Sequence, residues 1–305
     1  KMAATAYAPS AKCPNFDEML RATLPDDHQA FALRLFGYAL LGKPIQQIFA
    51  IFAGKGANGK STLLNAVANA IGDYATNVEP SSLIKQKSDR VRNDIARLKG
   101  ARLVGTSELA TGEILDSALV KRFTGGDTLT ARSLFKEYFE FQAEFVVFMT
   151  TNALPVIDGG DAALGRRIVI VPFRNVVPEA DRDPLLPQKL REEASGILNR
   201  LLYGLSDYQR IGLAIPADLK AEAAKYCASS DMLATFVDEE CELDPEATVG
   251  AQNLYNRYSG WCSINGIRAM SQPQFRAEMV KKLDCIPKKT KAGSVWPRLR
   301  LRKRH

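Results

Sequence analysis

The sequence of 305 residues has little of what disulfide, zinc or histidine chemistry requires. Its five cysteines are odd in number and form no C-x-x-C pair, so neither a disulfide framework nor a zinc cluster is expected. The histidines are limited to His28 and His305, which argues against a histidine base and against a histidine-ligated metal. Cysteines without a pairing pattern are typical of a reduced compartment, so the sequence predicts a cytoplasmic protein.

Long apolar stretches are lacking as well. No run of 18 apolar residues occurs, so we expect no membrane-spanning helix and no membrane partner. Residues 1–10 have no apolar centre of the kind that a signal peptide needs. With 46% hydrophobic and 25% charged residues the composition is that of a folded globular protein, and the length suits two or three domains.

Charge is unevenly distributed along the chain, whose formal net charge is +7. Residues 281–305 contain ten Lys and Arg against the single acid Asp284, whereas residues 238–246 are acidic. A basic end of this kind favours a polyanionic partner such as nucleic acid. A solvated basic tail would have the same composition, so the pattern alone leaves both interpretations open.

Short apolar segments separated by helical patterns occur in the first two thirds of the chain. They predict a helix over residues 61–71 and four buried strands, at 48–53, 102–106, 145–149 and 168–172. A hairpin is expected from residues 128–132 and 138–141. Buried strands that alternate with helices are typical of an α/β domain with a mainly parallel sheet.

Helical patterns outside these strands divide the rest of the chain. We expect a helical N-terminal segment over residues 1–44, with its periodicity interrupted at Gly37, and the α/β core over 45–187. A helical connector follows over 188–231, with helices predicted at 188–211 and 217–227. The last domain, 232–305, should contain helices near 236, at 255–264 and at 274–283, and a strand at 294–302.

The segment after the first predicted strand reads G-K-G-A-N-G-K-S and fits the phosphate-loop pattern G-x-x-x-x-G-K-[ST]. Glycines let the backbone wrap with its N–H groups turned inward at the start of a helix, which suits a bound phosphate. Lys60 would reach the β- and γ-phosphates of ATP, and Ser61 would ligate Mg²⁺. An ordinary glycine-rich turn is the alternative. The expected nucleotide-binding residues are Gly54, Lys55, Gly56, Ala57, Asn58, Gly59, Lys60, Ser61 and Thr62.

Two further strands end in polar residues that suit ATP hydrolysis. The strand at 102–106 is followed by Ser107-Glu108, and Glu108 would hold Mg²⁺ and orient the attacking water. The strand at 145–149 is followed by Asn152, which could bond the γ-phosphate or that water. Glu108 could equally be a surface acid, and Asn152 a turn residue before Pro155.

Arg166 and Arg167 come directly before the last predicted strand. A guanidinium supplied to a developing phosphoryl charge accelerates hydrolysis strongly. Paired arginines before a buried strand can also be simply solvated, and the residues alone favour that interpretation.

Taken in order, these segments resemble the superfamily 3 helicases, and among them the phage, plasmid and poxvirus primase-helicases. The likeness is strong over residues 30–175. The motifs that carry it are residues 54–61, 93–104 with Ser107-Glu108, 119–132, 151–155 and 161–173.

The resemblance implies an AAA+-like ATPase core and a homo-oligomeric ring, usually hexameric, with ATP and Mg²⁺ bound between subunits. It implies that Arg166 or Arg167 serves the ATP of a neighbouring subunit, without indicating which. It also implies a hairpin in the ring channel, where Lys121, Arg132 and Lys136 are the expected DNA-binding residues. A primase domain or protein is a further expected partner, and a phage-encoded chain would act in the host cytoplasm.

The basic carboxyl end follows a helix with a strand. Ser271 is suited to cap the helix, and Arg298, Arg300 and Arg302 alternate along the strand, which would place them on one side of it. This order resembles a winged helix that binds DNA, although a module for subunit packing would also fit.

The function favoured by these patterns is an ATP-dependent DNA helicase that acts on a single strand or fork during replication of a mobile element. A DNA-binding ATPase that does not translocate, such as a loader or origin-melting switch, and an RNA-directed motor are the alternatives. The expected channel hairpin favours the translocating enzyme.

Overall fold

The computed structural model describes residues 1–43, 45–84, 93–109, 113–132, 137–157, 162–229, 231–265, 269–290 and 293–302. These residues form two compact units. The first runs from Lys1 to Val156 and resumes as far as Lys225, and the second extends from Tyr226 towards the C-terminus. Within the described ranges, every helix is too short or too polar to cross a membrane.

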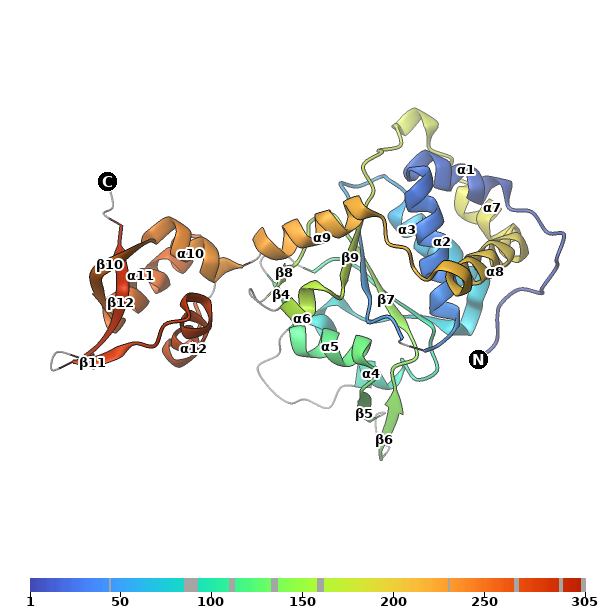
Figure 1. Cartoon of the computed structure of the whole chain (residues 1–305). Coiled ribbons are helices and arrows are strands. Elements are labelled where there is room, and N and C mark those ends of the chain that lie inside the picture. Colours follow the sequence, from blue (N-terminus) through green and yellow to red (C-terminus); the bar gives the residue numbers. More distant parts are fainter. Residues whose placement is uncertain are drawn as a thin grey trace. The chain divides into compact units, whose positions relative to one another are not determined.

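A sheet of five parallel strands lies at the centre of the first unit, in the order β2-β3-β7-β1-β9. Its strands are β1 (Phe49–Ala53), β2 (Ala75–Asn77), β3 (Leu103–Thr106), β7 (Val146–Thr151) and β9 (Ile168–Pro172). Strands β7 and β9 are labelled in Figure 1. The predicted α/β class with a mainly parallel sheet is therefore confirmed. Four strands lie at the predicted places, whereas β2 was not predicted because three residues show no apolar pattern.

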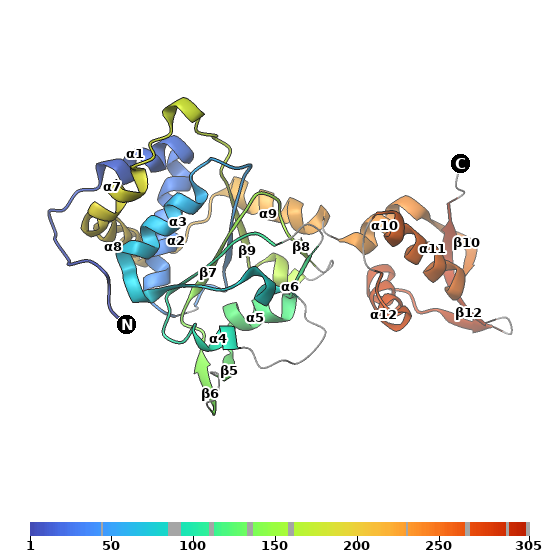
Figure 2. The same cartoon turned by 180° about the vertical axis from the view of Figure 1, so that it is seen from behind.

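Helices cover both faces of this sheet (Figures 1 and 2). One face carries α1 (Pro14–Thr23), α2 (Asp26–Leu40), α3 (Lys60–Ile71), α7 (Leu186–Glu192) and α8 (Ala194–Ile211). The other carries α5 (Ser117–Gly125) with the short α4 (Asn93–Ala96) and α6 (Ala162–Gly165). The remaining helical segments of this part of the chain are α9 (Ala217–Ser229), η1 (Gly72–Tyr74), η2 (Pro80–Leu83) and η3 (Glu179–Asp181).

The core under the first face contains a cluster of phenylalanines. Phe36 of α2 stacks on Phe148 of β7 with 4.9 Å between ring centroids. Phe52 of β1 lies 5.7 Å from Phe148 and 5.3 Å from Phe173, which follows β9. Rings from three adjacent strands therefore fix the sheet against α2.

Helices α2 and α8 cross at two glycines. A Cβ atom on Gly37 would lie 2.1 Å from the backbone N of Leu205, and one on Gly204 would lie 2.0 Å from the carbonyl oxygen of Leu33. The helical pattern predicted there is present as α2, which continues from Asp26 to Leu40 although Gly37 interrupts the apolar periodicity. The glycine serves the close approach of two helices.

The single helix predicted over residues 188–211 is also wrong. It is divided into α7 and α8 at Glu193, whose side chain caps the start of α1. The Glu193 carboxylate accepts hydrogen bonds from the backbone N–H groups of Asn15 and Phe16, both at 3.0 Å. A contact with a distant helix end thus decides the break, and the local pattern gives no sign of it.

Two small antiparallel pairs complete the first unit. The predicted hairpin is confirmed as β5 (Thr128–Arg132) and β6 (Tyr138–Gln142), paired from Thr128 with Gln142 to Arg132 with Tyr138. Both views show it projecting from the body of the unit (Figures 1 and 2). The second pair consists of β4 (Ile114–Leu115) and β8 (Val156–Ile157).

The second unit packs three helices on a three-stranded antiparallel sheet of order β10-β12-β11. Phe236 lies at the centre of its core, with the rings of Tyr258, Trp261 and Phe275 within 6.1 Å. The predicted helices and strand are present as α10 (Met232–Glu240), α11 (Ala251–Ile264), α12 (Gln272–Leu283) and β12 (Gly293–Leu301). Strands β10 (Cys241–Gly250) and β11 (Lys288–Thr290) were not predicted, since both are rich in charged or polar residues.

Replacing Gly204 with Ala should lower the free energy of unfolding of the first unit by about 3 kcal/mol, because the new methyl group meets backbone atoms that cannot move independently. Gly260→Ala is the matched control. Gly260 lies within α11 with no atom near its Cβ position, so alanine there should stabilise by up to about 1 kcal/mol. Calorimetry of both variants measures this, and equal transitions would contradict the close crossing.

Candidate functional site

The segment between β1 and α3 forms a tight loop in which two residues adopt left-handed backbone conformations. Ala57 has φ 54° and Gly59 φ 82°. A Cβ atom on Gly54 would lie 2.3 Å from both the Asn58 Nδ2 atom and the Phe173 carbonyl oxygen, and one on Gly59 would lie 2.7 Å from the Thr23 methyl group. The two glycines of the motif are therefore required by close packing.

Lys60 is the first residue of α3, and its side chain is almost completely buried at 5% exposure. Its ammonium group donates to the carbonyl oxygen of Gly54 at 2.5 Å and to the Oδ1 atom of Asn58 at 2.8 Å. A longer contact of 3.4 Å reaches the Oδ1 atom of Asn152. Burial lowers the pKa of Lys60, and the negative charge of Glu108 opposes this effect.

Glu108 and Asn152 meet at the carboxyl ends of neighbouring strands. β3 and β7 are parallel and paired, so the residues that follow them lie at the same edge of the sheet. The Glu108 carboxylate accepts a hydrogen bond of 2.9 Å from the backbone N–H of Asn152 and a longer one of 3.4 Å from its side-chain amide. Three predicted catalytic residues, Lys60, Asn152 and Glu108, are thus brought together.

The chain that leaves β9 runs along the loop and holds it. We define residues 173–177 as the strap. Phe173 donates its N–H to the Ala53 carbonyl at 2.7 Å, and Val177 donates to the Ala57 carbonyl at 2.9 Å. The strap was not predicted as part of the site, since only its backbone groups make these contacts and the sequence gives no signal for them.

An open pocket of about 380 Å³ lies between the loop, the strap and the end of β7. It is lined by Ala53, Gly54, Lys55, Asn152, Pro172, Phe173, Arg174 and Val176. Gly56 and Ser61 of the motif are exposed, and Thr62 is half-buried. Exposed residues of the motif therefore lie close in the chain to the buried Lys60.

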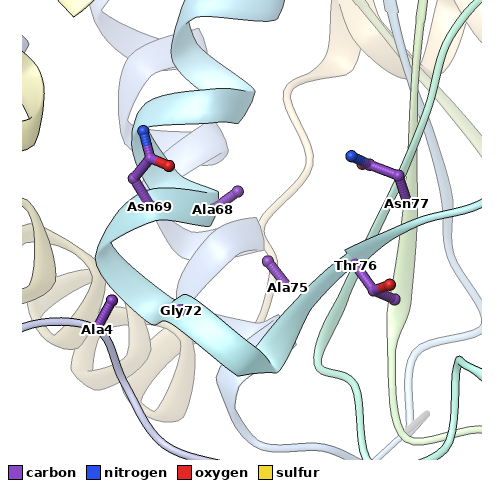
Figure 3. A pocket seen from close by; sticks show the side chains of 7 residues that line it. All are labelled: Ala4, Ala68, Asn69, Gly72, Ala75, Thr76 and Asn77. Carbon is purple, nitrogen blue, oxygen red and sulfur yellow. The ribbon is translucent and has the colours of Figure 1, made fainter. Parts of the chain in front are cut away.

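A second pocket, of about 250 Å³, lies at the other end of α3 (Figure 3). It is lined by Ala4, Ala68, Asn69, Gly72, Ala75, Thr76 and Asn77, which include no charged side chain. None of the predicted site residues lies in it.

Arg166 and Arg167 lie at the amino ends of the strands, whereas the loop lies at their carboxyl ends. β9 runs parallel to β1, with Ile168 opposite Phe49 and Pro172 opposite Ala53. The arginines precede β9, so the length of the strand, about 16 Å for five residues, separates them from the loop of their own chain. They are not part of the cluster around Lys60.

The two arginines differ in their surroundings. Arg167 is half-buried, and its Nη1 atom donates to the carbonyl oxygen of Ala163 at 2.5 Å. Arg166 is exposed, and no described residue forms an ion pair or hydrogen bond with its guanidinium. Arg167 thus has a contact within its own unit, whereas the side chain of Arg166 is exposed.

The predicted DNA-binding residues of the hairpin region are only partly described. Arg132 is the last residue of β5 and lies over the ring of Tyr138, with 5.2 Å from its guanidinium carbon to the ring centroid. Tyr138 is 60% exposed. Lys121 is half-buried on α5, and Lys136 lies outside the described residues.

The predicted DNA-binding arginines at the carboxyl end, Arg298 and Arg300 of β12 and Arg302 directly after it, are not equivalent. All are exposed, but Arg298 has φ 58° and interrupts the regular strand, so that Trp296 and Leu299 are both buried although three residues apart. Arg300 forms ion pairs with Asp244 at 3.0 Å and with Glu242 at 3.5 Å. Arg302 donates from Nε to the carbonyl oxygen of Cys241 at 2.9 Å. The positive charge of Arg300 is therefore matched by acidic side chains of β10.

Comparison with known proteins gives two family matches. Residues 52–167 match a family of unknown function, DUF5906, and residues 228–296 match the family described as Poxvirus D5 protein-like. The first range includes the loop and the strand ends around Lys60, and the second covers most of the second unit.

The sequence relatives are viral proteins provisionally named as helicases or primases. The helicase L207/L206 of Acanthamoeba polyphaga mimivirus is 27% identical and covers 82% of this chain, and the helicase V13 of Sputnik virophage is 25% identical and covers 62%. The primase C962R of African swine fever virus is 24% identical and covers 72%. This chain spans only 28%, 27% and 25% of their respective lengths.

Among solved structures, the apo C-terminal region of NrS-1 has the same fold, with a TM-score of 0.58 at 13% identity. The likeness covers 96% of this chain and 78% of that one. Together these matches show that the chain is similar to helicase and primase proteins of viral replication. The predicted resemblance to poxvirus-type primase-helicases is confirmed.

Proposed function

We propose that this chain is the ATPase part of a ring-forming DNA helicase of the superfamily 3 type. The observation that carries the proposal is the line of contacts from Lys60 through Asn152 to Glu108, at the carboxyl ends of three adjacent parallel strands. Ligands of open parallel sheets bind at this edge. The names of the viral relatives support the same function.

The residues around the loop fit ATP and Mg²⁺. A buried ammonium that faces only oxygen acceptors is suited to bind phosphate oxygens, and the left-handed residues Ala57 and Gly59 turn the backbone of the loop around it. Ser61 and Glu108 are exposed, and their side-chain oxygens are ligands that suit Mg²⁺. The bound ion would supply positive charge to the phosphates. Glu108 would orient the attacking water. Its carboxylate is itself held in place by a hydrogen bond from the backbone N–H of Asn152.

The position of the arginines supports an active site shared between subunits. A guanidinium at the far edge of the sheet cannot reach the loop of its own chain, but it can reach a neighbour's in a ring. Of the two, Arg166 is the one we assign to the neighbouring subunit, because Arg167 is engaged by Ala163. A hexamer is the expected ring.

DNA would contact both units. The hairpin of β5 and β6 projects from the ATPase unit and presents Arg132 beside the exposed ring of Tyr138, a pair suited to phosphate and base (Figure 1). The second unit, with its three helices and antiparallel sheet, would act as a winged-helix-like DNA-binding domain.

A projecting hairpin favours translocation over a stationary loader or switch. The primase names of some relatives favour a primase domain or protein as partner.

Lys60→Ala should reduce ATP turnover by at least about 100-fold, because the ammonium that neutralises phosphoryl charge is lost. Lys220→Ala, at an exposed position of α9, is the matched control and should hydrolyse ATP normally. Turnover is measured as phosphate release, and strand displacement is followed on forked DNA and RNA. Wild-type hydrolysis by the Lys60 variant would refute the assignment of the loop, and displacement of RNA alone would favour an RNA-directed motor.

Arg166→Ala should lower turnover by about 10³-fold or more, the range for an arginine that serves phosphoryl transfer. Mixing this inactive variant with inactive Lys60→Ala should recover part of the activity, because an intact loop from one then meets an intact arginine from the other. Arg167→Ala should instead lower thermal stability. A mixture that assembles yet stays inactive would contradict the shared site.

Arg298→Ala should reduce the slope of log affinity against log salt concentration for DNA by about one, as expected for one lost phosphate contact. Arg300→Ala should change the slope less, because Asp244 and Glu242 already pair with this guanidinium. Binding titrations at several salt concentrations measure both slopes. A larger change of slope for Arg300→Ala than for Arg298→Ala would contradict the prediction. It would show that Arg300 leaves Asp244 and Glu242 to contact DNA.

A further inference from the structure

Asn58 is the most completely buried residue of the loop, with 2% exposure against 5% for Lys60. Its side-chain amide is fully used inside the protein. The Nδ2 atom donates to the carbonyl oxygens of Phe173 at 2.9 Å and Lys55 at 3.2 Å, and the Oδ1 atom accepts from the Lys60 ammonium at 2.8 Å. No donor of this side chain is left for a phosphate.

The Phe173 carbonyl is a rigid anchor for this amide. Phe173 follows β9, and its own N–H bonds the Ala53 carbonyl at the end of β1. The amide lies in a slot between Phe173 and Gly54, because a Cβ atom on Gly54 would come within 2.3 Å of both the Phe173 oxygen and the Asn58 Nδ2 atom. A longer side chain at position 58 would not fit this slot.

We propose that Asn58 is a positioning residue, which transmits the fixed position of the Phe173 carbonyl to the ammonium group of Lys60. A lysine side chain is a point charge on a flexible stem of four carbons and loses considerable rotamer freedom when it is held. Because the Asn58 oxygen that accepts from Lys60 is itself anchored, the lysine side chain is already ordered before phosphate binds. Less conformational entropy is then lost on binding. The proposal rests on the proposed ATP site, and it gives the side chain of Asn58 a role within the predicted nucleotide-binding loop.

The chemistry of the slot explains why asparagine is suited to it and aspartate is not. A carboxylate at position 58 would accept from Lys60 but could not donate to the carbonyls of Phe173 and Lys55, so three acceptors would face one another without a proton. It would also form an ion pair with Lys60 and place negative charge beside the phosphates. Asn58→Asp should therefore weaken nucleotide binding more than Asn58→Ala.

A double-mutant cycle on nucleotide affinity tests the proposal on the full chain. The probe is N-methylanthraniloyl-ATP with Mg²⁺, titrated by fluorescence without any need for turnover. Asn58→Ala should weaken binding by roughly 10-fold in the wild-type background, and by less than about 2-fold when Lys60 is already alanine, because a residue that acts through Lys60 has nothing left to position. Asn175→Ala is the control, since its amide bonds the Ala22 carbonyl from the same strap without touching Lys60.

Equal losses in the two backgrounds would overturn the positioning role and leave Asn58 with a structural one. Thermal unfolding without nucleotide checks that each variant folds. If Asn58→Ala does not fold, Asn58→Ser, which keeps a small hydroxyl group in the slot, carries the same cycle. Failure of the wild-type chain to bind the probe would instead refute the ATP site itself, and the positioning role with it.

Discussion

The buried ammonium of Lys60 is the interaction on which the site depends. A charge removed from water is costly unless its hydrogen bonds are satisfied, and here Gly54, Asn58 and Asn152 each present an oxygen to it. Gly54 and Gly59 permit this enclosure because a side chain at either position would meet neighbouring atoms. The arrangement is therefore a packed structure that holds a cation in place, and only a strong anion would compete with its present acceptors.

The parallel sheet gives this cation its neighbours and determines what lies far from it. Strand direction brings Glu108 and Asn152 to the carboxyl ends of the strands, where the loop lies, and places Arg166 at the amino ends. One chain thus carries the cluster around Lys60 and the arginine Arg166 on separate surfaces, which is the arrangement that a ring of identical subunits can use. Strand β9 connects the two surfaces, from the arginines at its start to the Phe173 anchor of Asn58 beyond its end.

Much of the fold could be predicted from the sequence, because buried strands and glycine-rich turns are local patterns. The loop, four strands of the sheet and the hairpin are examples. The break at Glu193, the crossing at Gly37 and the pairing of Arg300 with β10 could not be predicted, since each depends on a residue distant in the sequence. The same holds for Asn58, whose anchor is a backbone carbonyl more than a hundred residues away.

A structure of the assembled chain with Mg²⁺ and a non-hydrolysable ATP analogue, determined by electron cryomicroscopy, tests the central claim most directly. We expect the Lys60 ammonium within hydrogen-bonding distance of the β- and γ-phosphates, Glu108 beside the γ-phosphate, and an Arg166 guanidinium from the adjacent subunit completing the site. A nucleotide bound away from Lys60, or subunits packed with every Arg166 remote from the phosphates, would contradict the claim.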